Sequence, residues 1–388
     1  MARLGDICEV LNGYAFKSEK YTSSGVRIIR ITNVQKGYIE DTAPAFYPID
    51  TTDIEKYTLY EDDLLISLTG NVGRVALLKK EFLPAALNQR VACLRLKDSA
   101  QYDKSFLYCF LNSDYFENKC IQSAKGVAQK NMSTEWLKEY QIPNLSLVKQ
   151  KEIAAVLNKI SELISARTMQ LLKMDKFVKA RFIELFGDSE YNTRHWPTAK
   201  LSSLCYVGSS KRIYQSELTD NGIPFLRISD LNERIDGKDN APQLFISTEK
   251  FDELRSNRLI PLAGDILVTT RGTLGRCYII KESDSFYFQD GMISWLSNMC
   301  DSVTSLYVSE LFATTGVQKQ IANLQAGSTV AYLSIAMLKK LDIMLPPLAL
   351  QNQFAAFVEQ TDKSKLAIQQ SLEKLETLKK ALMQQYFG

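Results

Sequence analysis

The chain has 388 residues, which is enough for about two to four domains with buried cores. Hydrophobic residues make up 45% and charged residues 23%, as is typical of soluble globular proteins, and no long apolar run predicts a membrane-spanning helix. The net charge of +3 neither requires nor excludes a nucleic-acid partner, so the local distribution of charge must decide.

The supply of reactive residues excludes several kinds of active site. His195 is the only histidine, which excludes a His-based catalytic triad, an HExxH zinc site and a two-histidine metal centre. Its polar surroundings predict a surface position. The seven cysteines are scattered and form no C-x-x-C pair, so we expect reduced thiols that mainly fill cores. The N-terminus lacks the features of a secretory signal, and we expect a cytoplasmic protein.

The first part of the chain predicts a globular domain rich in short strands. Runs of Ile, Val and Leu alternate with Gly, Asn and Asp, which mark strands and turns. A helix is expected near 105–118. The predicted strand runs are VRIIRITNV (26–34), DLLISLT (63–69), RVALLKK (74–80) and RVACLRL (90–96).

A long helix is predicted from 147 to 186, with Gly187 placed to end it. Apolar residues recur at alternating steps of four and three, which is the heptad seam of a coiled coil, and Arg167 and Arg181 interrupt it. Such a helix is about 55–60 Å long, too long for the core of a small domain. The seam consists of Ile153, Leu157, Ile160, Ile164, Leu171, Met174, Val178 and Leu185.

The rest of the chain predicts a second domain of the same kind and a second long helix. We expect a helix near 305–324 and the long helix from 348 to 386, after Pro346 and Pro347. The two long helices are predicted to pair; the alternative is that each is a simple packing helix. The strand runs are PFLRISDL (224–231), DILVTT (265–270), RCYIIKE (276–282) and MISWLS (292–297), and the helix seam is Phe354, Val358, Ile368, Leu372, Leu375 and Leu382.

The two halves repeat one another. The segment DLLISLTGNVGR (63–74) is repeated 202 positions later as DILVTTRGTLGR (265–276), and Gln150 corresponds to Gln351. Two copies are too few for a solenoid and predict two similar domains with a pseudo-twofold relation. The predicted fold is α+β: two β-rich domains separated and joined by two long antiparallel coiled-coil helices. The expected boundaries are 1–146, 147–187, 188–346 and 347–388.

The sequence lacks common motifs of nucleotide-binding and methyltransferase sites. The sequence has no G-x-x-x-x-G-K-[ST] phosphate loop, no G-x-G-x-x-G after a strand, and no Asn/Asp-Pro-Pro-aromatic tetrapeptide of an amino-methyltransferase. The acidic run EDDLL (61–65) suggests a nuclease, but the second copy keeps only Asp265 of its three acids. We therefore expect Asp63 and Asp265 to lead from a turn into a strand. A nuclease or methyltransferase with unrecognised motifs stays an alternative.

Two similar domains on a spacer suit double-stranded DNA, whose grooves recur about every 34 Å. Residues that differ between the copies are candidates for reading bases, with Arg271 suited to guanine and Asn71 or Asn131 to adenine. Residues shared by both copies serve the fold or grip phosphate. The base-reading candidates are Thr69, Asn71, Gln89, Arg90, Lys130, Asn131, Arg271, Thr273, Gln289, Thr329 and Tyr332. The phosphate or scaffold candidates are Arg30, Arg74, Lys125, Arg227, Arg276 and Ser328.

The order of glycine turn, Gly-Ser-Thr loop, Pro-Pro-Leu and long helix resembles the specificity (S) subunit of Type I restriction-modification systems. The second copy carries it in TRGTLGR (270–276) and in AGSTVAYLSIAMLKKLDIMLPPLALQNQF (326–354). The first copy carries LTGNVGR (68–74), lacks the double proline and has Gly-Val for Gly-Ser, so the Ser/Thr loop is carried over only to the second half.

This resemblance implies a recognition subunit that is not itself an enzyme. Each domain would recognise one half of a split, asymmetric DNA target, and the helices would set the unspecified gap and bind two methyltransferase (M) subunits. Those subunits would use S-adenosylmethionine to methylate adenine. Restriction/translocase (R) subunits would add ATP- and Mg²⁺-dependent translocation and cleavage, so no cofactor or metal is expected in this chain. The alternatives are a Type IIB-like system with the same domains and a coiled-coil adaptor without a nucleic-acid role.

Overall fold

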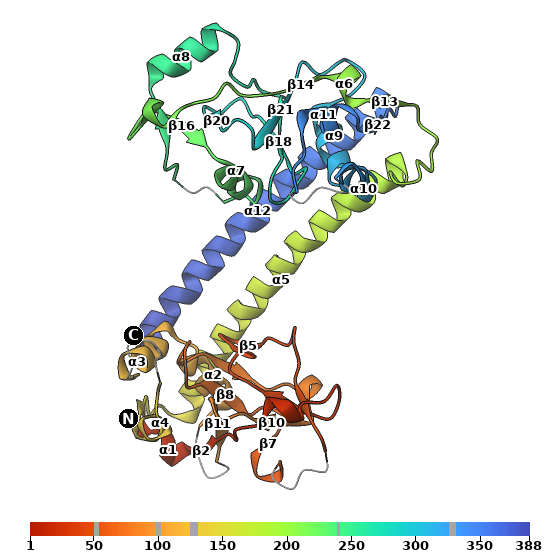
Figure 1. Ribbon diagram of the computed structural model, residues 1–388. Helices are drawn as coiled ribbons and strands as arrows, with labels where there is room; N and C mark the ends of the chain where they lie inside the picture. Colours follow the sequence, from red (N-terminus) through yellow and green to blue (C-terminus); the bar gives the residue numbers. More distant parts are fainter. Residues whose placement is uncertain (50–53, 98–101, 125–130, 239–240, 326–330) are drawn as a thin grey trace. The chain divides into compact units, whose positions relative to one another are not determined.

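The computed structural model describes residues 1–49, 54–97, 102–124, 131–238, 241–325 and 331–388 (Figure 1). They form two compact units, Met1–Met169 with Ile368–Gly388 and Gln170–Ala367. The mixed α/β class with two tandem similar domains is confirmed. Each unit holds the first part of one long helix and the last part of the other, so the boundaries drawn at 146, 187 and 346 stay a prediction.

Two four-stranded sheets form the β part of the first unit. In the first sheet all neighbours are antiparallel, and in the second the two central strands are parallel. The first sheet has the order β2 (Cys8–Asn12), β11 (Val91–Leu96), β8 (Leu64–Ser67), β9 (Val75–Leu77). The second has the order β6 (Phe46–Tyr47), β3 (Val26–Ile29), β10 (Ala85–Leu87), β7 (Thr58–Leu59). Two short pairs are β1 (Ala2–Arg3) with β12 (Gln141–Ile142) and β4 (Val34–Gln35) with β5 (Tyr38–Ile39).

The second unit repeats the first sheet of the first unit and three of the four strands of its second sheet. Its first sheet has the same antiparallel order, and the second again contains one parallel pair, β16 with β20. The first sheet consists of β14 (Tyr206–Ser209), β21 (Ile293–Ser297), β18 (Ile266–Thr269), β19 (Cys277–Ile279). The second consists of β15 (Leu218–Thr219), β17 (Phe245–Ile246), β16 (Ile223–Leu226), β20 (Tyr287–Phe288), and β13 (Thr198–Lys200) pairs with β22 (Asp342–Met344). The order of the first sheet therefore confirms the repeat, and in the second sheet β17, β16 and β20 match β6, β3 and β10. The fourth strand differs, since β15 pairs with β17 whereas β7 pairs with β10.

Each helix predicted near 105–118 and 305–324 is divided into two. In the first unit the buried hydroxyl of Ser113 accepts from the backbone N–H of Phe116 and so begins a new helix. The resulting pairs are α2 (Lys104–Leu111) with α3 (Asp114–Ser123), and α9 (Ser305–Phe312) with α10 (Thr315–Leu324). The other short helices are α1 (Leu4–Ile7), α4 (Thr134–Glu139), α6 (Leu201–Leu204), α8 (Thr248–Ser256) and α11 (Ile335–Lys339). The 3₁₀ turns are η1 (Ser18–Lys20), η2 (Glu55–Tyr57), η3 (Lys80–Phe82) and η4 (Gln215–Glu217).

The predicted strand run 224–231 is wrong in its second half. Strand β16 ends at Leu226, and the helix α7 (Ile228–Ile235) follows. The carboxylate of Asp230 accepts a hydrogen bond of 2.9 Å from the backbone N–H of Arg227 and caps this helix, while Leu231 on the same helix is fully buried. A local capping signal therefore overrides the β-type composition of the run.

The two long helices are α5 (Leu147–Phe186) and α12 (Leu348–Phe387), which confirms both expected helices and extends the second by one residue. All predicted seam residues are buried or half-buried. Of the two interruptions, Arg181 is half-buried, pairs with Glu184 at 2.8 Å and lies over the ring of Phe357. Pairing of the helices over their full length stays a prediction.

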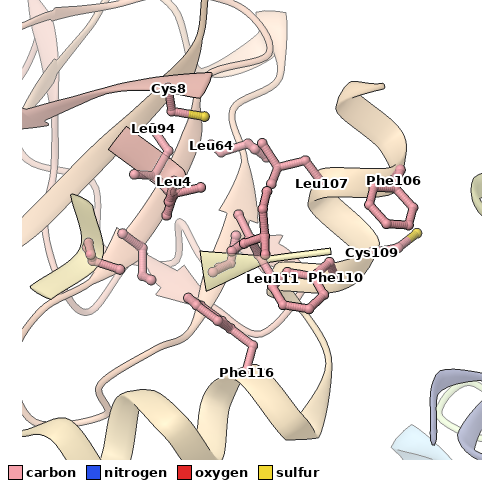
Figure 2. Close-up of a cluster of buried hydrophobic side chains, with 14 of the residues drawn as sticks. Leu4, Cys8, Leu64, Leu94, Phe106, Leu107, Cys109, Phe110, Leu111 and Phe116 are labelled. Carbon is pink, nitrogen blue, oxygen red and sulfur yellow. The ribbon is translucent and has the colours of Figure 1, made fainter. Parts of the chain in front are cut away.

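The core of each unit receives the final turn of a long helix. In the first unit, Phe387 of α12 lies 5.6 Å from Phe106 and 5.4 Å from Phe110, centroid to centroid. Figure 2 shows this core, in which Leu4 lies near side chains from the first sheet, α2 and α3. In the second unit, Phe186 of α5 lies 4.9 Å from Tyr307. Each domain is thus closed by a helix that begins in the other unit.

The remaining composition-based expectations also have clear outcomes. All seven cysteines are free, and five of them are buried. His195 is exposed, as its polar surroundings predict. No helix among the described residues is both long enough and apolar enough to cross a membrane.

Candidate nucleic-acid interface

The glycine turn is built in the same way in both units. In the loop after β8 the hydroxyl of Ser67 accepts from the backbone N–H of Arg74 at 3.0 Å, and after β18 the hydroxyl of Thr269 accepts from that of Arg276 at 3.0 Å. Each hydroxyl also donates to a carbonyl inside its loop. A short polar side chain at the strand end therefore fixes both loops, while their tips are left free to differ.

The shared glycines of this turn are required by space as well as by backbone conformation. Gly73 and Gly275 have φ of +86° and +72°, a region that favours glycine. A Cβ at Gly73 would lie 2.7 Å from Cys120 Cβ, and one at Gly275 would lie 2.8 Å from Ile321 Cδ1. The turns therefore pack directly against α3 and α10. This explains why both copies keep glycine at these positions.

Three separate segments of the first unit meet beside this turn. Thr69 forms a backbone bridge with Asn131, and Met132 N–H donates to Leu68 O at 2.8 Å. Leu68 N–H in turn donates to Arg90 O at 3.0 Å. The structure thus brings together candidates that lie 62 positions apart in the sequence.

The second unit makes the matching contacts. Arg271 forms a backbone bridge with Tyr332, Leu333 N–H donates to Thr270 O at 3.0 Å, and Thr270 N–H donates to Met292 O at 3.0 Å. One surface in each unit is therefore formed by three segments: the glycine turn, the turn before β11 or β21, and the segment before α4 or α11. We call this surface the three-loop edge.

The candidates differ in exposure. The half-buried base-reading candidates are Thr69, Gln289 and Tyr332. The exposed ones are Asn71, Gln89, Arg90, Asn131, Arg271 and Thr273. Four candidates, Lys125, Lys130, Ser328 and Thr329, lie outside the described residues.

The arginines at the end of the glycine turn are held within their own units. The guanidinium of Arg74 donates to the side-chain oxygen of Gln35. That of Arg276 donates to Asn232 at 2.9 Å and pairs with Asp236, and this hydrogen bond lowers the pKa of the Asp236 carboxyl. Sequence reasoning missed Gln35 and Asn232, although they lie at matching positions of the repeat, 197 apart. The contacts favour a scaffold role for both arginines.

The other shared arginines are also partnered. Arg30 donates to the carbonyl of Ala43. Arg227 pairs with Asp230 at 3.3 Å and donates to the side-chain oxygen of Gln243 at 3.0 Å. The guanidinium groups of all four arginines that are common to both copies therefore make contacts within the chain.

The acidic residues that suggested a nuclease are turn anchors. Asp63 directly precedes β8, accepts from Tyr60 N–H at 2.8 Å and pairs with Arg95 at 2.6 Å. Asp265 directly precedes β18 and accepts from Leu262 N–H at 2.9 Å and from the indole N–H of Trp295 at 2.8 Å. Burial raises the pKa of the Asp265 carboxyl, and these two hydrogen bonds oppose the rise. The expectation that both residues lead from a turn into a strand is confirmed.

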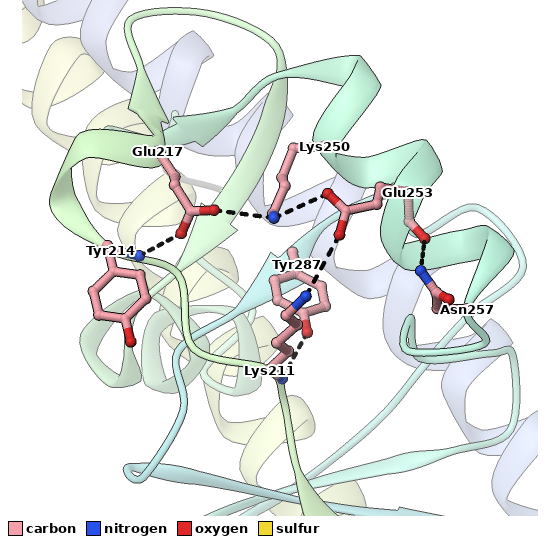
Figure 3. Close-up of polar contacts among 7 residues, drawn as sticks. All are labelled: Lys211, Tyr214, Glu217, Lys250, Glu253, Asn257 and Tyr287. Carbon is pink, nitrogen blue, oxygen red and sulfur yellow. Dashed lines mark hydrogen bonds and ion pairs between the residues drawn. The ribbon is translucent and has the colours of Figure 1, made fainter.

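A polar network in the second unit supports one of its three loops. Figure 3 shows Lys250 of α8 between Glu217 and Glu253, at 3.0 Å from each. Lys211 reaches Glu253 at 3.4 Å, and its backbone N–H donates to the hydroxyl of Tyr287 at 2.8 Å.

The next residue of this segment extends the support to the three-loop edge. Arg212 forms an ion pair of 2.8 Å with Asp290, the neighbour of the candidate Gln289. The network therefore holds the turn before β21 from outside the edge.

Comparison with known proteins gives one family. The family described as Type I restriction modification DNA specificity domain matches residues 1–173 and 193–379. The Type I restriction enzyme EcoAI specificity subunit of Escherichia coli is 34% identical over 198 residues, which cover 49% of this chain and 33% of that subunit. A putative Type I restriction enzyme specificity subunit of Haemophilus influenzae is 27% identical over 297 residues, which cover 72% of this chain and 71% of that subunit. The match thus spans only a third of the first relative's length.

Solved structures share the fold. The S subunit of a Type-I restriction-modification system from M. genitalium aligns with a TM-score of 0.58 at 17% identity, over 100% of this chain and 95% of that one. A chain from a structure concerned with complex assembly and conformational transition of the type I R-M system aligns with a TM-score of 0.58 at 16% identity, over 100% of this chain and 96% of that one.

Proposed function

This chain belongs to the family of Type I restriction modification DNA specificity domains, and we propose that it binds a split, asymmetric double-stranded DNA target with one domain on each half-site. The observation that carries the proposal is the three-loop edge, which both units build from matching segments. Shared residues hold its backbone, while the exposed positions differ, as Asn71 and Thr273 do. An edge with a common scaffold and variable tips suits two readers of different sequences.

The chemistry would belong to partner subunits. Two methyltransferase (M) subunits would bind the outward faces of α5 and α12 and methylate adenine with S-adenosylmethionine. Restriction/translocase (R) subunits would supply the ATP- and Mg²⁺-dependent cleavage. A Type IIB-like system would use the same recognition domains with other partners. The anchoring roles of Asp63 and Asp265 support a chain that binds and does not cleave.

Co-expression with a methyltransferase (M) subunit of a Type I restriction-modification system, followed by single-molecule methylome sequencing, tests the proposal. We expect one motif with two different half-sites separated by a fixed unspecified gap. The purified chain alone, incubated with DNA, Mg²⁺ and S-adenosylmethionine, should give no turnover. Turnover by the chain alone would favour an enzyme, and failure of the complex to retain any DNA at low salt would favour an adaptor.

Arg276→Ala is expected to weaken DNA binding at all sequences about equally, by at most roughly fivefold, because its ion pair with Asp236 is partly exposed. If the role is scaffolding, Asp236→Ala should give the same loss, with the motif and the salt dependence unchanged. Binding titrations at several salt concentrations measure both properties. A salt slope reduced by about one in Arg276→Ala alone would instead assign this guanidinium to phosphate.

Lengthening α5 by four residues after Met169 is expected to widen the unspecified gap and leave both half-sites unchanged. One helical turn adds about 5.4 Å, which corresponds to one or two base-pair steps of about 3.4 Å. Methylome sequencing of the variant complex gives the new gap directly. A changed half-site with an unchanged gap would contradict a spacer role for this helix.

A further inference from the structure

Arg271 differs from Arg276, the other arginine of the second unit's three-loop edge. Its side chain is exposed, and among the described residues no group accepts a hydrogen bond from its guanidinium. The guanidinium carbon lies 5.0 Å from the ring centroid of Tyr332, which is half-buried. Arg276, in contrast, is bound to Asn232 and Asp236. One arginine of the turn is thus held by the fold, and the other is positioned by a ring but donates no hydrogen bond to the described residues.

The backbone under this stacked pair is fixed. Arg271 and Tyr332 form a backbone bridge, and the flanking contacts are Leu333 N–H to Thr270 O and Thr270 N–H to Met292 O. A ring beneath a guanidinium covers its face and leaves the in-plane N–H groups at its edge available. Stacking also restricts the rotamers of a flexible side chain, so less entropy is lost when the edge binds a ligand.

The donors at the guanidinium edge select a ligand edge with two neighbouring acceptors. In the major groove, guanine presents N7 and O6, both of which are acceptors. Adenine presents N7 beside an N6 amino group, which is a donor and would face a guanidinium that can only donate. On the premise of the proposed function, we propose that Arg271, positioned by Tyr332, reads one guanine in the half-site bound by the second domain.

The first unit lacks this pair at the same positions. Its residues there are Thr69 and Asn131, which form the same backbone bridge but provide neither a cation nor a ring. Asn71 lies beside them, and with its amide oxygen turned toward Arg74 it accepts from that guanidinium at 3.2 and 3.3 Å. The two half-sites therefore differ at the base pair that faces this bridge, and the guanine requirement belongs to the second domain alone.

Base substitution in the reconstituted complex with the methyltransferase tests the assignment. In one half-site of the mapped motif, replacing one guanine with 7-deazaguanine or adenine should lower wild-type affinity by about 10- to 100-fold. Arg271→Ala should bring this ratio close to one at that position alone. Tyr332→Ala should reduce the ratio, and Tyr332→Phe, which keeps the ring, should preserve it. An Arg271→Ala complex that keeps the wild-type motif in both half-sites would overturn the proposal, and an unchanged ratio in Tyr332→Ala would overturn the role of the ring.

Transplanting the pair gives an independent test. The double variant Thr69→Arg/Asn131→Tyr places an arginine and a ring on the matching bridge of the first unit. We expect it to gain a guanine preference at the matching position of the other half-site, while Thr69→Arg alone gains less. A relaxed first half-site without preference for guanine would contradict the inference. A wild-type complex that methylates no split motif would overturn the proposed function itself, so the two failures are distinguishable.

Discussion

Arg95→Met is expected to lower the free energy of unfolding of the first unit by about 3 kcal/mol, because it leaves the buried carboxylate of Asp63 without its counter-ion. The Asp63 side chain is only 4% exposed, and Arg95 donates to its two oxygens at 2.8 and 2.6 Å. This contact raises the pKa of Arg95. Arg95 also lies 4.6 Å from the ring centroid of Tyr60, so methionine fills part of the same space without the charge.

Hydrogen–deuterium exchange of the β8 and β11 amides measures this loss within the first unit alone. The double variant Asp63→Asn/Arg95→Met removes the stranded charge and should recover most of the stability, which completes a double-mutant cycle. Lys79→Met, at an exposed position just after β9, is the matched control and should have little effect. A double variant as unstable as Arg95→Met would show that lost packing, and not the unpaired charge, is responsible.

Gln351→Leu is expected to destabilise the second unit by about 4 kcal/mol, because three backbone groups lose the hydrogen-bond partner that this buried side chain provides. Gln351 is fully buried near the start of α12, and its side-chain oxygen accepts from Thr304 N–H at 2.8 Å. Its amide nitrogen donates to the carbonyls of Ser302 at 2.9 Å and Pro346 at 3.0 Å. One side chain thus joins the start of the long helix to the start of α9.

Differential scanning calorimetry should place the transition of the second unit about 10 °C lower in this variant. Gln353 is exposed and lies two residues further along the same helix. Gln353→Leu therefore makes the same change without removing a buried amide, and it should leave the transition temperature nearly unchanged. Equal transition temperatures in the two variants would mean that replacing any glutamine of this helix lowers the stability, whether or not its amide is buried.

The first unit contains the same device. The side chain of Gln150 accepts from Asp103 N–H at 2.8 Å and donates to Leu145 O at 2.8 Å. In the sequence repeat, Gln150 and Gln351 correspond only because both are glutamine, and the repeat does not indicate what either side chain does. Its role depends on a backbone N–H 47 positions away in each copy, which no local pattern reports.

The wrong predictions share this cause. The run 224–231 has the composition of a strand, yet its second half forms α7, since Asp230 caps a helix there. The helices expected as single elements are divided, because Ser113 in the first unit starts a second helix. Composition over eight to fourteen residues averages over such caps, whereas one side-chain hydrogen bond decides where a helix begins.

The amino-acid sequence alone predicted the duplication, most of the sheet strands that flank the glycine turn, both long helices and the family. Each of these follows from short-range periodicity or from matching segments of the repeat. Which side chains contact one another depends on the three-dimensional packing. The bridges from Thr69 to Asn131 and from Arg271 to Tyr332 depend on how distant loops are brought together by strand order. So does the difference between Arg276, which donates to Asn232, and Arg271, which lies over the ring of Tyr332. Strand order follows from the packing of the whole core, and no single stretch of the chain contains enough information to specify that packing.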